Sequence, residues 1–355
     1  MHTVFSPSRP ARVVIVDDVQ SIRMMIRAML QSNPAIEVVG EAGDPFEARE
    51  LIRSLNPDVI TLDVVMPRMD GLDFLERLMR LRPMPVVMVS TRTTEKSQEA
   101  IKALALGAVD CVDLGQLRKS QDSRLLADTV LMAASSNLGA VSRGGADRPT
   151  AGGASAQHDW NGKVVVIGSS TGGVDALLQV LSGIPPDGPP ILIAQHMPAP
   201  FLESFAARLE RHCRASVFLS EDRIKMAPGH VFLAVGGDTH AILSDRDPCR
   251  IKHVRHNGFE TYVPSVNLLF GSAAPHGSRV VGVMLTGMGN DGAAAMLEMR
   301  KAGAHTIVQD SASAVIDGMP RSAREIGAAV EVASLSQISD RILASTSKTR
   351  EEVPS

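Results

Sequence analysis

Three side chains of the kinds that form a nucleophilic triad occur in separate short motifs of this 355-residue chain. Ser170 stands in the turn Gly168-Ser169-Ser170-Thr171-Gly172-Gly173, His196 in Q-H-M-P, and Asp291 in G-N-D-G. A serine hydroxyl becomes a nucleophile when a histidine takes its proton and a carboxylate orients the imidazole. The three residue types therefore predict acyl-transfer chemistry, provided that the fold brings them together.

Each of these residues also has a simpler interpretation. A glycine-rich turn after a strand can cradle a phosphate, and the glycines around Ser170 would serve either purpose. A single histidine such as His196 is more often structural than catalytic, and an aspartate before a helix, as at Asp291, can be its N-cap. The assignment therefore depends on whether the three residues converge.

The segments that precede the three residues indicate such convergence. Each residue follows a short, continuous apolar run typical of a strand buried in a parallel sheet, namely Val164–Ile167, Pro190–Ala194 and Val280–Leu285. The middle of the serine turn matches G-x-S-x-G, a sharp bend between strand and helix. Because the carboxyl ends of parallel strands meet at one edge of a sheet, the three side chains are expected at the same edge. Their chain order, Ser-His-Asp, differs from that of the α/β-hydrolases, which predicts a separate fold.

A second set of chemical residues lies in the N-terminal third. Asp17 and Asp18 follow the predicted strand Arg12–Val16, and Asp63 follows the predicted strand Asp58–Leu62. Carboxylates brought together repel one another, and a hard divalent cation such as Mg²⁺ relieves that repulsion. Any one of them alone could be a solvated loop residue, but together they predict a cation site.

Further strands are predicted at Ile36–Gly40, Pro85–Val89 and Val109–Val112, with apolar segments of helical spacing between the strands. Alternating strands and helices predict an α/β domain with a doubly wound parallel sheet. A second domain of the same class is expected around the serine, histidine and aspartate motifs.

The first of these domains resembles the response-regulator receiver family over residues 11–116. The resemblance rests on V-D-D at Asp17 and Asp18, D-x-x-M-P-x-M-D-G from Asp63, and Ser90 after the fourth strand. It implies a flavodoxin-like (βα)5 fold in which Asp63 accepts a phosphoryl group from a histidine kinase. It also implies that Asp17, Asp18 and Asp63 hold Mg²⁺ and that Ser90 is the switch residue, which suits a reaction that needs positioning and charge neutralisation.

One departure from the receiver pattern concerns the end of the fifth strand. Leu114 and Gly115 stand where receivers usually have lysine and proline, and Cys111 replaces the usual switch aromatic. A leucine cannot pair with a phosphoryl group. We therefore expect phosphoryl transfer to survive but its coupling to the rest of the protein to be weakened.

The second domain, residues 161–345, resembles the catalytic domain of the chemotaxis protein-glutamate methylesterases, the CheB family, a Rossmann-like parallel-sheet fold. The shared motifs are G-x-S-T-G-G, Q-H-M-P, L-T-G-M-G-x-D-G and G-M-P. The resemblance implies catalytic Ser170, His196 and Asp291, with the backbone N–H of Met288 as an oxyanion donor. It further implies hydrolysis of glutamyl methyl esters on chemoreceptor helices with release of methanol. Whether this chain also deamidates receptor glutamines stays open.

This domain departs from the family pattern at two places. The chain reads Val263-Pro264-Ser265-Val266-Asn267, preceded by Tyr262, where the family usually has R-P-S-V-D, and Asp317 stands where phenylalanine is usual. Substrate or interdomain contacts are expected to differ there. For the methionines near the motifs, core packing and substrate contact stay equally open; they are Met197, Met284, Met288 and Met319.

Composition narrows the class of protein and its partners. A net charge of −3 and 3% aromatic residues argue against a nucleic-acid surface, and no apolar run approaches the ~20 residues of a membrane span. We therefore expect a cytoplasmic protein without membrane insertion. The expected partners are chemoreceptors and a chemotaxis histidine kinase. Oligomeric state is left open, with a monomer expected, and no cofactor is expected for the esterase.

The three cysteines, Cys111, Cys213 and Cys249, indicate neither disulfides nor a metal site.

Residues 117–160 are expected to be a linker, because Gly139–Gln157 is rich in glycine, serine and alanine. Two other functions are compatible with a serine-bearing α/β domain next to a receiver. A nucleotide-binding module lacks support because the serine turn is not G-x-G-x-x-G. A receiver-linked methylesterase of a non-flagellar chemosensory pathway stays open.

Overall fold

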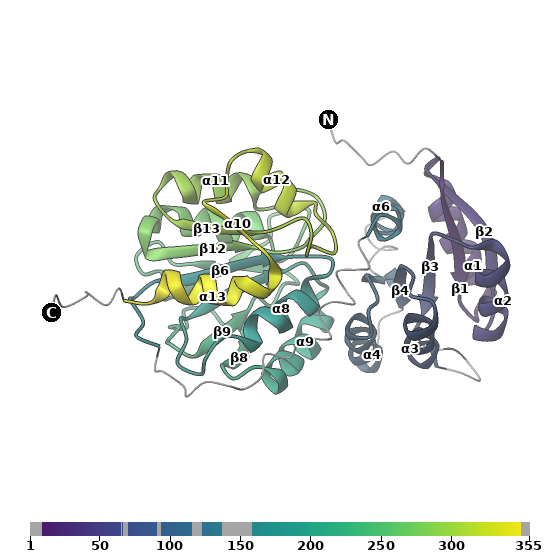
Figure 1. The fold of residues 1–355 in the computed structure, drawn as a ribbon, viewed down its shortest axis with the longest axis horizontal. Coiled ribbons are helices and arrows are strands. Elements are labelled where there is room, and N and C mark those ends of the chain that lie inside the picture. Colours follow the sequence, from purple (N-terminus) through teal and green to yellow (C-terminus); the bar gives the residue numbers. More distant parts are fainter. Residues whose placement is uncertain are drawn as a thin grey trace. The chain divides into compact units, whose positions relative to one another are not determined.

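The computed structural model describes residues 9–64, 66, 70–90, 94–115, 123–136 and 158–348. The chain divides into two compact units, residues 1–142 and 143–355, and each unit is described by itself (Figure 1). The elements of the first unit are β1 (Ala11–Val16), α1 (Gln20–Gln31), β2 (Ile36–Ala42), α2 (Pro45–Leu55), β3 (Val59–Asp63), α3 (Gly71–Leu81), β4 (Val86–Ser90), α4 (Thr94–Ala105), β5 (Asp110–Asp113) and α6 (Ser123–Ala134).

The first unit is built on a 5-stranded sheet in the order β2-β1-β3-β4-β5. Every pairing in it is parallel, which confirms the predicted doubly wound fold. The central strand β1 is apolar and buried, with Val13, Val14 and Ile15 all inaccessible to solvent. Such continuous apolar runs are expected where helices cover both faces of a sheet. The order reverses direction between β1 and β3, and their carboxyl ends therefore flank the crevice where this fold places its site.

Helix α6 falls inside the segment expected to be a linker, and it packs on the first unit. It contacts α1 and the strands β3, β4 and β5, with Leu126 and Val130 buried. This helix thus contributes to the core of the first unit. Residues 137–157, which include the glycine-rich tract, lie outside the described residues, and the linker boundaries stay a prediction.

The second unit contains the remaining elements. They are β6 (Val164–Ser169), α8 (Gly173–Ser182), β7 (Ile191–Gln195), α9 (Ala199–His212), β8 (Ser216–Leu219), β9 (His230–Leu233), β10 (Thr239–Leu243), β11 (Ile251–Arg255), α10 (Val266–Ala273), the 3₁₀ helix η1 (Ala274–Arg279), β12 (Val280–Met284), α11 (Ala293–Lys301), β13 (His305–Gln309), α12 (Met319–Glu325), β14 (Glu331–Ala333) and α13 (Leu335–Thr346).

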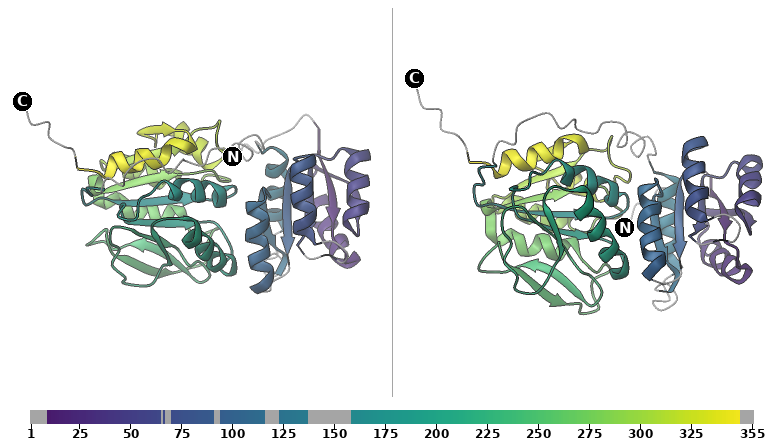
Figure 2. Two further views of the ribbon diagram at one scale, coloured as in Figure 1. Left: turned by 60° about the horizontal axis from the view of Figure 1, so that its bottom comes forward. Right: turned by 90° about the horizontal axis from the view of Figure 1, so that it is seen from below.

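The second unit is a 7-stranded parallel sheet in the order β14-β13-β12-β6-β7-β9-β8. Helices α8 and α13 pack side by side on one face, and α10, α11 and α12 form a contiguous layer on the other (Figures 1 and 2). The chain runs outward from β6 through β7 and later returns to β12 on the other side of β6. The edge at the carboxyl ends of β6, β7 and β12 is therefore a topological switch point, where ligands bind in such sheets.

The antiparallel ribbon of β10 and β11 was not predicted from the sequence. It leads through residues 256–265 into α10, whose N-terminus lies at the site described below. Within the part of the chain that the structure describes, no helix is long and apolar enough to cross a membrane.

Candidate active site

Ser170 lies in the tight turn between β6 and α8. Gly172 adopts a left-handed backbone conformation, with φ of 77°, which favours glycine because a side chain there would be strained. The N–H of Ser170 donates to the carbonyl of Thr286 at 3.0 Å, and the N–H of Gly173 donates to the carbonyl of Ser170 at 2.8 Å. These two donors of the turn are used within the protein and do not face a ligand. The geometry thus favours a presented serine over a phosphate cradle.

The turn that follows β12 packs directly on the Ser170 turn. Thr286, fully buried, donates from Oγ1 to the carbonyl of Thr171 at 3.0 Å. A Cβ added to Gly287 would lie 2.8 Å from Cβ of Ser170, so only glycine permits this approach. The backbone N–H of Met288, next in the chain, donates to no acceptor among the described residues. It is therefore an available donor close to the serine.

His196 follows β7 and is tied to the serine turn through its neighbours. Its N–H donates to the carbonyl of Ser169 at 3.0 Å. Gln195 accepts from Ser169 Oγ at 2.6 Å and donates to the carbonyl of Ser170 at 2.9 Å. The strand ends that carry the histidine and the serine are thus locked together by a buried amide.

The His196 imidazole is held by one of its nitrogens and leaves the other without a partner. Nε2 lies 2.8 Å from Oδ2 of Asp291. Nδ1 is buried and has no hydrogen-bond partner among the described residues. In the part of the chain described, no hydrogen bond joins Nδ1 to Ser170 Oγ. Catalytic hydrogen bonds are often long or absent before substrate binds. Nδ1 is nevertheless the nitrogen left to serve as a base.

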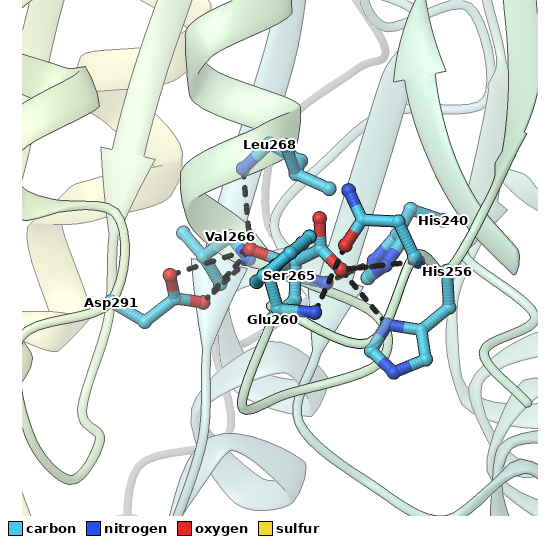
Figure 3. Close-up of polar contacts among 9 residues, drawn as sticks. His240, His256, Glu260, Ser265, Val266, Leu268 and Asp291 are labelled. Atoms are coloured by element: carbon cyan, nitrogen blue, oxygen red, sulfur yellow. Dashed lines mark hydrogen bonds and ion pairs between the residues drawn. The ribbon is translucent and has the colours of Figure 1, made fainter.

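Asp291 is held in place by a helix that is not its own. Its carboxylate accepts from the backbone N–H of Val266 at 2.7 Å (Figure 3). It also accepts from the backbone N–H of Asn267 at 3.1 Å, and both donors lie in the first turn of α10. The residue that caps the following helix α11 is Gly292. Asp291 thus lies next to the N-cap of α11, near where the capping interpretation placed it, but its carboxylate binds the N–H groups of α10 and His196.

These contacts also set the charge of Asp291. Burial alone would raise the pKa of this carboxyl, but the hydrogen bond and charge of His196 and the N–H groups of Val266 and Asn267 outweigh it and lower the pKa below its ordinary value. An ionised carboxylate at neutral pH is what an imidazole needs in order to hold its proton on the nitrogen that faces the aspartate.

An aromatic ring covers one face of the imidazole. Tyr262 stacks on His196 with the ring centroids 4.1 Å apart and the planes 9° from parallel. In the sequence this residue stands just before the altered motif Val263–Asn267, and nothing predicted its contact with His196. Gln195 and Thr286 were likewise missed as positioning residues, although both lie inside the quoted motifs Q-H-M-P and L-T-G-M-G.

The remaining sequence features separate into core and surface. Met197, Met284 and Met319 are buried, which favours core packing over substrate contact for these three, whereas Met288 is half-buried. Asp317, which replaces the usual phenylalanine, forms an ion pair with Arg324 at 2.6 Å. The substitution thus introduces a polar contact beside the G-M-P motif.

The first unit holds an acidic cluster at the predicted place. Asp17, Asp18 and Asp63 each offer a carboxylate oxygen within 4.8 Å of the others, at the carboxyl ends of the neighbouring strands β1 and β3. Asp17 and Asp63 are buried, so their charges are poorly screened. An all-oxygen donor set of this kind fits Mg²⁺.

The switch positions of the first unit are only partly described. Ser90 ends β4, but its side chain lies outside the described part of the structure, and its switch role stays a prediction. Leu114 is 1% exposed and is packed in the interior. Burial raises the pKa of the Cys111 thiol, which therefore stays protonated.

In the second unit, burial raises the pKa of the Cys213 thiol to about 12, so this cysteine also stays a thiol.

The fold and the site define a hydrolase on a parallel α/β sheet that is joined to a second α/β domain with an acidic crevice. The family model for the CheB methylesterase matches residues 165–342, and that for the response regulator receiver domain matches residues 13–126.

Curated relatives extend this similarity to nearly the whole chain. A protein-glutamate methylesterase/protein-glutamine glutaminase 1 of Caulobacter vibrioides is 48% identical over 94% of this chain and 97% of its own. A protein of the same kind from Bordetella bronchiseptica is 46% identical over 94% of this chain and 96% of its own. The solved CheB methylesterase catalytic domain of Thermotoga maritima is 33% identical, covers 52% of this chain and 98% of its own, and gives a TM-score of 0.49. The chain belongs to the CheB methylesterase family, a family of hydrolases, and its N-terminal domain is a response-regulator receiver.

Proposed function

We propose that this chain removes methyl groups from glutamyl esters on the cytoplasmic helices of chemoreceptors, with Ser170, His196 and Asp291 as its catalytic triad. The observation that carries the proposal is the state of His196. One imidazole nitrogen is fixed by a carboxylate, while the other is buried and without a partner, at the sheet edge that also holds the serine turn. Burying a ring nitrogen without a hydrogen-bond partner lowers the stability of the fold. A role for this nitrogen as the catalytic base explains why the protein keeps it unpaired.

The reaction then follows acyl transfer. His196 Nδ1 takes the proton of Ser170 Oγ, which attacks the ester carbonyl, and the N–H of Met288 donates to the oxygen that becomes negative. Collapse of the tetrahedral intermediate breaks the bond to the methoxy oxygen, which leaves as methanol with the proton from the imidazolium. Water activated by the same nitrogen hydrolyses the acyl-serine and restores the glutamate carboxylate.

The same residues support deamidation of receptor glutamines, the second activity in the names of the relatives. The acyl-enzyme is identical, and only the leaving group changes from methanol to ammonia. Because the amine must be protonated as it leaves, the imidazolium of His196 becomes more important in this reaction. We propose that both activities use one site.

We place the protein in the cytoplasm. The test of the proposal is the rate of methanol release from methylated receptor, measured with the full chain. Ser170→Ala should abolish release. Ser182→Ala is the matched control, because Ser182 ends α8, the helix that follows the Ser170 turn, and its hydroxyl donates to the carbonyl of Gln179. Methanol release by Ser170→Ala at the parent rate would overturn the proposal.

For the receiver domain we propose that Asp63 accepts a phosphoryl group from a histidine kinase. Mg²⁺, held by Asp17, Asp18 and Asp63, would neutralise the charge of the incoming phosphoryl group. Titration calorimetry should show weak Mg²⁺ binding that Asp17→Asn and Asp18→Asn each remove. Asp73→Asn, on the exposed side of α3, should leave binding unchanged. Equal affinity in all of these variants would contradict the site.

A further inference from the structure

The imidazole of His196 is fixed at one atom by Asp291 and over one whole face by Tyr262. A single hydrogen bond at Nε2 fixes the position of that nitrogen but leaves the ring free to tilt about it. A ring stacked 9° from parallel with its centroid 4.1 Å away fixes the plane of the imidazole. The direction in which Nδ1 points depends on that plane, and so the Tyr262 ring has a geometric role that Asp291 cannot fill.

Tyr262 is carried by residues 256–265, the loop between β11 and α10, and a carboxylate holds this loop from within. Oε2 of Glu260 accepts from Nδ1 of His256 at 2.9 Å and lies 3.8 Å from Nε2 of His240. The backbone N–H of Asn257 donates to the same carboxylate at 3.4 Å. The loop is thereby closed on itself and tied to β10, which carries His240 (Figure 3).

His240 shows that this cluster is a clamp rather than a metal site. The ligand atoms of His240, His256 and Glu260 lie within 4.8 Å of one another, as they would around an ion. Nδ1 of His240, however, accepts the backbone N–H of Ser265 at 3.1 Å. A neutral imidazole whose Nδ1 is an acceptor carries its proton on Nε2, which leaves no lone pair there for a metal. Nε2 lies 3.8 Å from Oε2 of Glu260, beyond hydrogen-bond distance, and has no hydrogen-bond partner among the described residues.

The clamp and the triad share one residue. Ser265 donates its N–H to His240 and places its Oγ 3.4 Å from Oδ1 of Asp291. The N–H of the next residue, Val266, binds the Asp291 carboxylate directly. Figure 3 shows Ser265 between Asp291 on one side and Glu260 on the other. The loop therefore contacts the triad twice, through Tyr262 at the imidazole and through Ser265 at the carboxylate, next to the contact of Val266 in α10.

We propose that Tyr262 is a positioning residue of the esterase, which aims Nδ1 of His196 at the serine, and that Glu260, bound by His256 and by the N–H of Asn257, holds the loop that carries it. This inference rests on the proposed triad, because His196 must be the base for its orientation to matter. The two fail separately. An active Ser170→Ala variant overturns the triad, whereas an unimpaired Tyr262→Ala variant beside an inactive Ser170→Ala variant overturns only this inference.

The kinetic test compares Tyr262→Phe, Tyr262→Ala and the control Phe259→Ala. Phe259 is an aromatic residue of the same loop that is 91% exposed. We expect Tyr262→Phe, which keeps the stacked ring, to retain more of the parent kcat than Tyr262→Ala. Tyr262→Ala should lower kcat by about 3- to 100-fold with little change in KM, because the orientation of the base is lost. Phe259→Ala should not lower kcat. A parent kcat in Tyr262→Ala, or equal losses in Tyr262→Ala and Tyr262→Phe, would contradict the stack.

A second measurement does not depend on activity. Tyr262 is the only tyrosine in the chain, so tyrosine labelled with ¹³C in its ring gives NMR signals from this residue alone. Its ring signals should move in His196→Gln, which removes the stacked imidazole, and should keep their positions in Phe259→Ala. Ring signals that are unchanged by His196→Gln would contradict the contact.

The clamp is tested by a double-variant cycle. Glu260→Ala should lower kcat as Tyr262→Ala does, and the double variant should lose little more, since both changes remove the same positioning. Independent, multiplicative losses would contradict the clamp. Zn²⁺ should not raise the Tm of the parent protein. A Zn²⁺-dependent rise that Glu260→Ala removes would show a metal site and overturn this part of the inference.

Discussion

The carboxylate of Asp291 performs two tasks with two oxygens. Oδ2 accepts from His196 and from the N–H of Val266, and Oδ1 accepts from the N–H of Asn267. Asparagine has nearly the same shape but offers only one acceptor oxygen. In either orientation its amide nitrogen would face an N–H donor, so both the helix cap and the histidine contact cannot be satisfied together.

We predict that Asp291→Asn lowers kcat by about 10²- to 10⁴-fold and the free energy of unfolding by about 1–3 kcal/mol. Unfolding can be followed by the fluorescence of Trp160, the only tryptophan, whose indole donates to the carbonyl of Lys163 in the second unit.

The pH dependence of this stability follows from the lowered pKa of Asp291. The stabilisation is fully present above the ordinary pKa of about 4 and is lost as pH falls through the lower, folded-state pKa. The stability difference between parent and Asp291→Asn should therefore shrink in acid below about pH 4. A difference that stays constant to the acid limit of folding would contradict the role of the ionised carboxylate.

At the scale of elements, the packing of α8 against α9 buries a carboxyl group. Asp175 lies in the first turn of α8, and burial raises its pKa to about 6, although the charge of Arg208 on α9 acts in the opposite direction. Arg208 itself has a buried Nε without a hydrogen-bond partner among the described residues. Since the folded state binds the Asp175 proton more tightly than the unfolded chain, ionising this group costs stability.

We predict that Asp175→Asn removes part of the pH dependence of unfolding. The parent should lose stability as pH rises from about 4 through about 6, by at most ~3 kcal/mol, and the variant should not. Asp340→Asn on the exposed side of α13 is the control and should follow the parent. Stability curves of Asp175→Asn and the parent that run parallel across this range would contradict the assignment.

All five strands of the first sheet, and β6, β7 and β12 of the second, were predicted because continuous apolar runs mark strands buried on both faces. For example, Val164–Ile167 was expected and β6 is Val164–Ser169. The strands β8, β9, β13 and β14 were not predicted. The convergence of serine, histidine and aspartate was predictable for the same reason, since parallel strands end at one edge. The β10–β11 ribbon and the loop after it were missed, because short antiparallel strands carry little periodic signal. The stack of Tyr262 on His196 depends on how that loop packs, which no local pattern encodes.

At the scale of the whole molecule, the proposed function requires the receiver to influence the active site of the other domain. Receivers usually do this through a lysine that pairs with the phosphoryl group, and here Leu114 occupies that place, 1% exposed. Losing a charge-assisted contact of about 1.5–3 kcal/mol should weaken the coupling between phosphorylation and activity. Phosphoryl transfer itself should persist, because Asp17, Asp18 and Asp63 are present and adjacent.

We predict that a small phosphodonor changes the methanol-release rate of the intact chain only slightly, and that Leu114→Lys enlarges the response. Asp63→Ala should remove whatever response exists in either background. The measurement is the rate with and without donor in all four proteins. Strong activation of the parent that Asp63→Ala abolishes would show that Leu114 has not weakened the switch.

The catalytic triad is the central claim, and the most direct measurement of it is a double-variant cycle on Ser170 and His196. Triad members act as a unit, so Ser170→Ala and His196→Ala should each lower the kcat for methanol release by about 10⁴-fold or more, and the double variant should be no worse than the single ones. All three proteins should keep the parent Tm within a few degrees. Losses that multiply in the double variant, or substantial methanol release by folded Ser170→Ala, would contradict the claim.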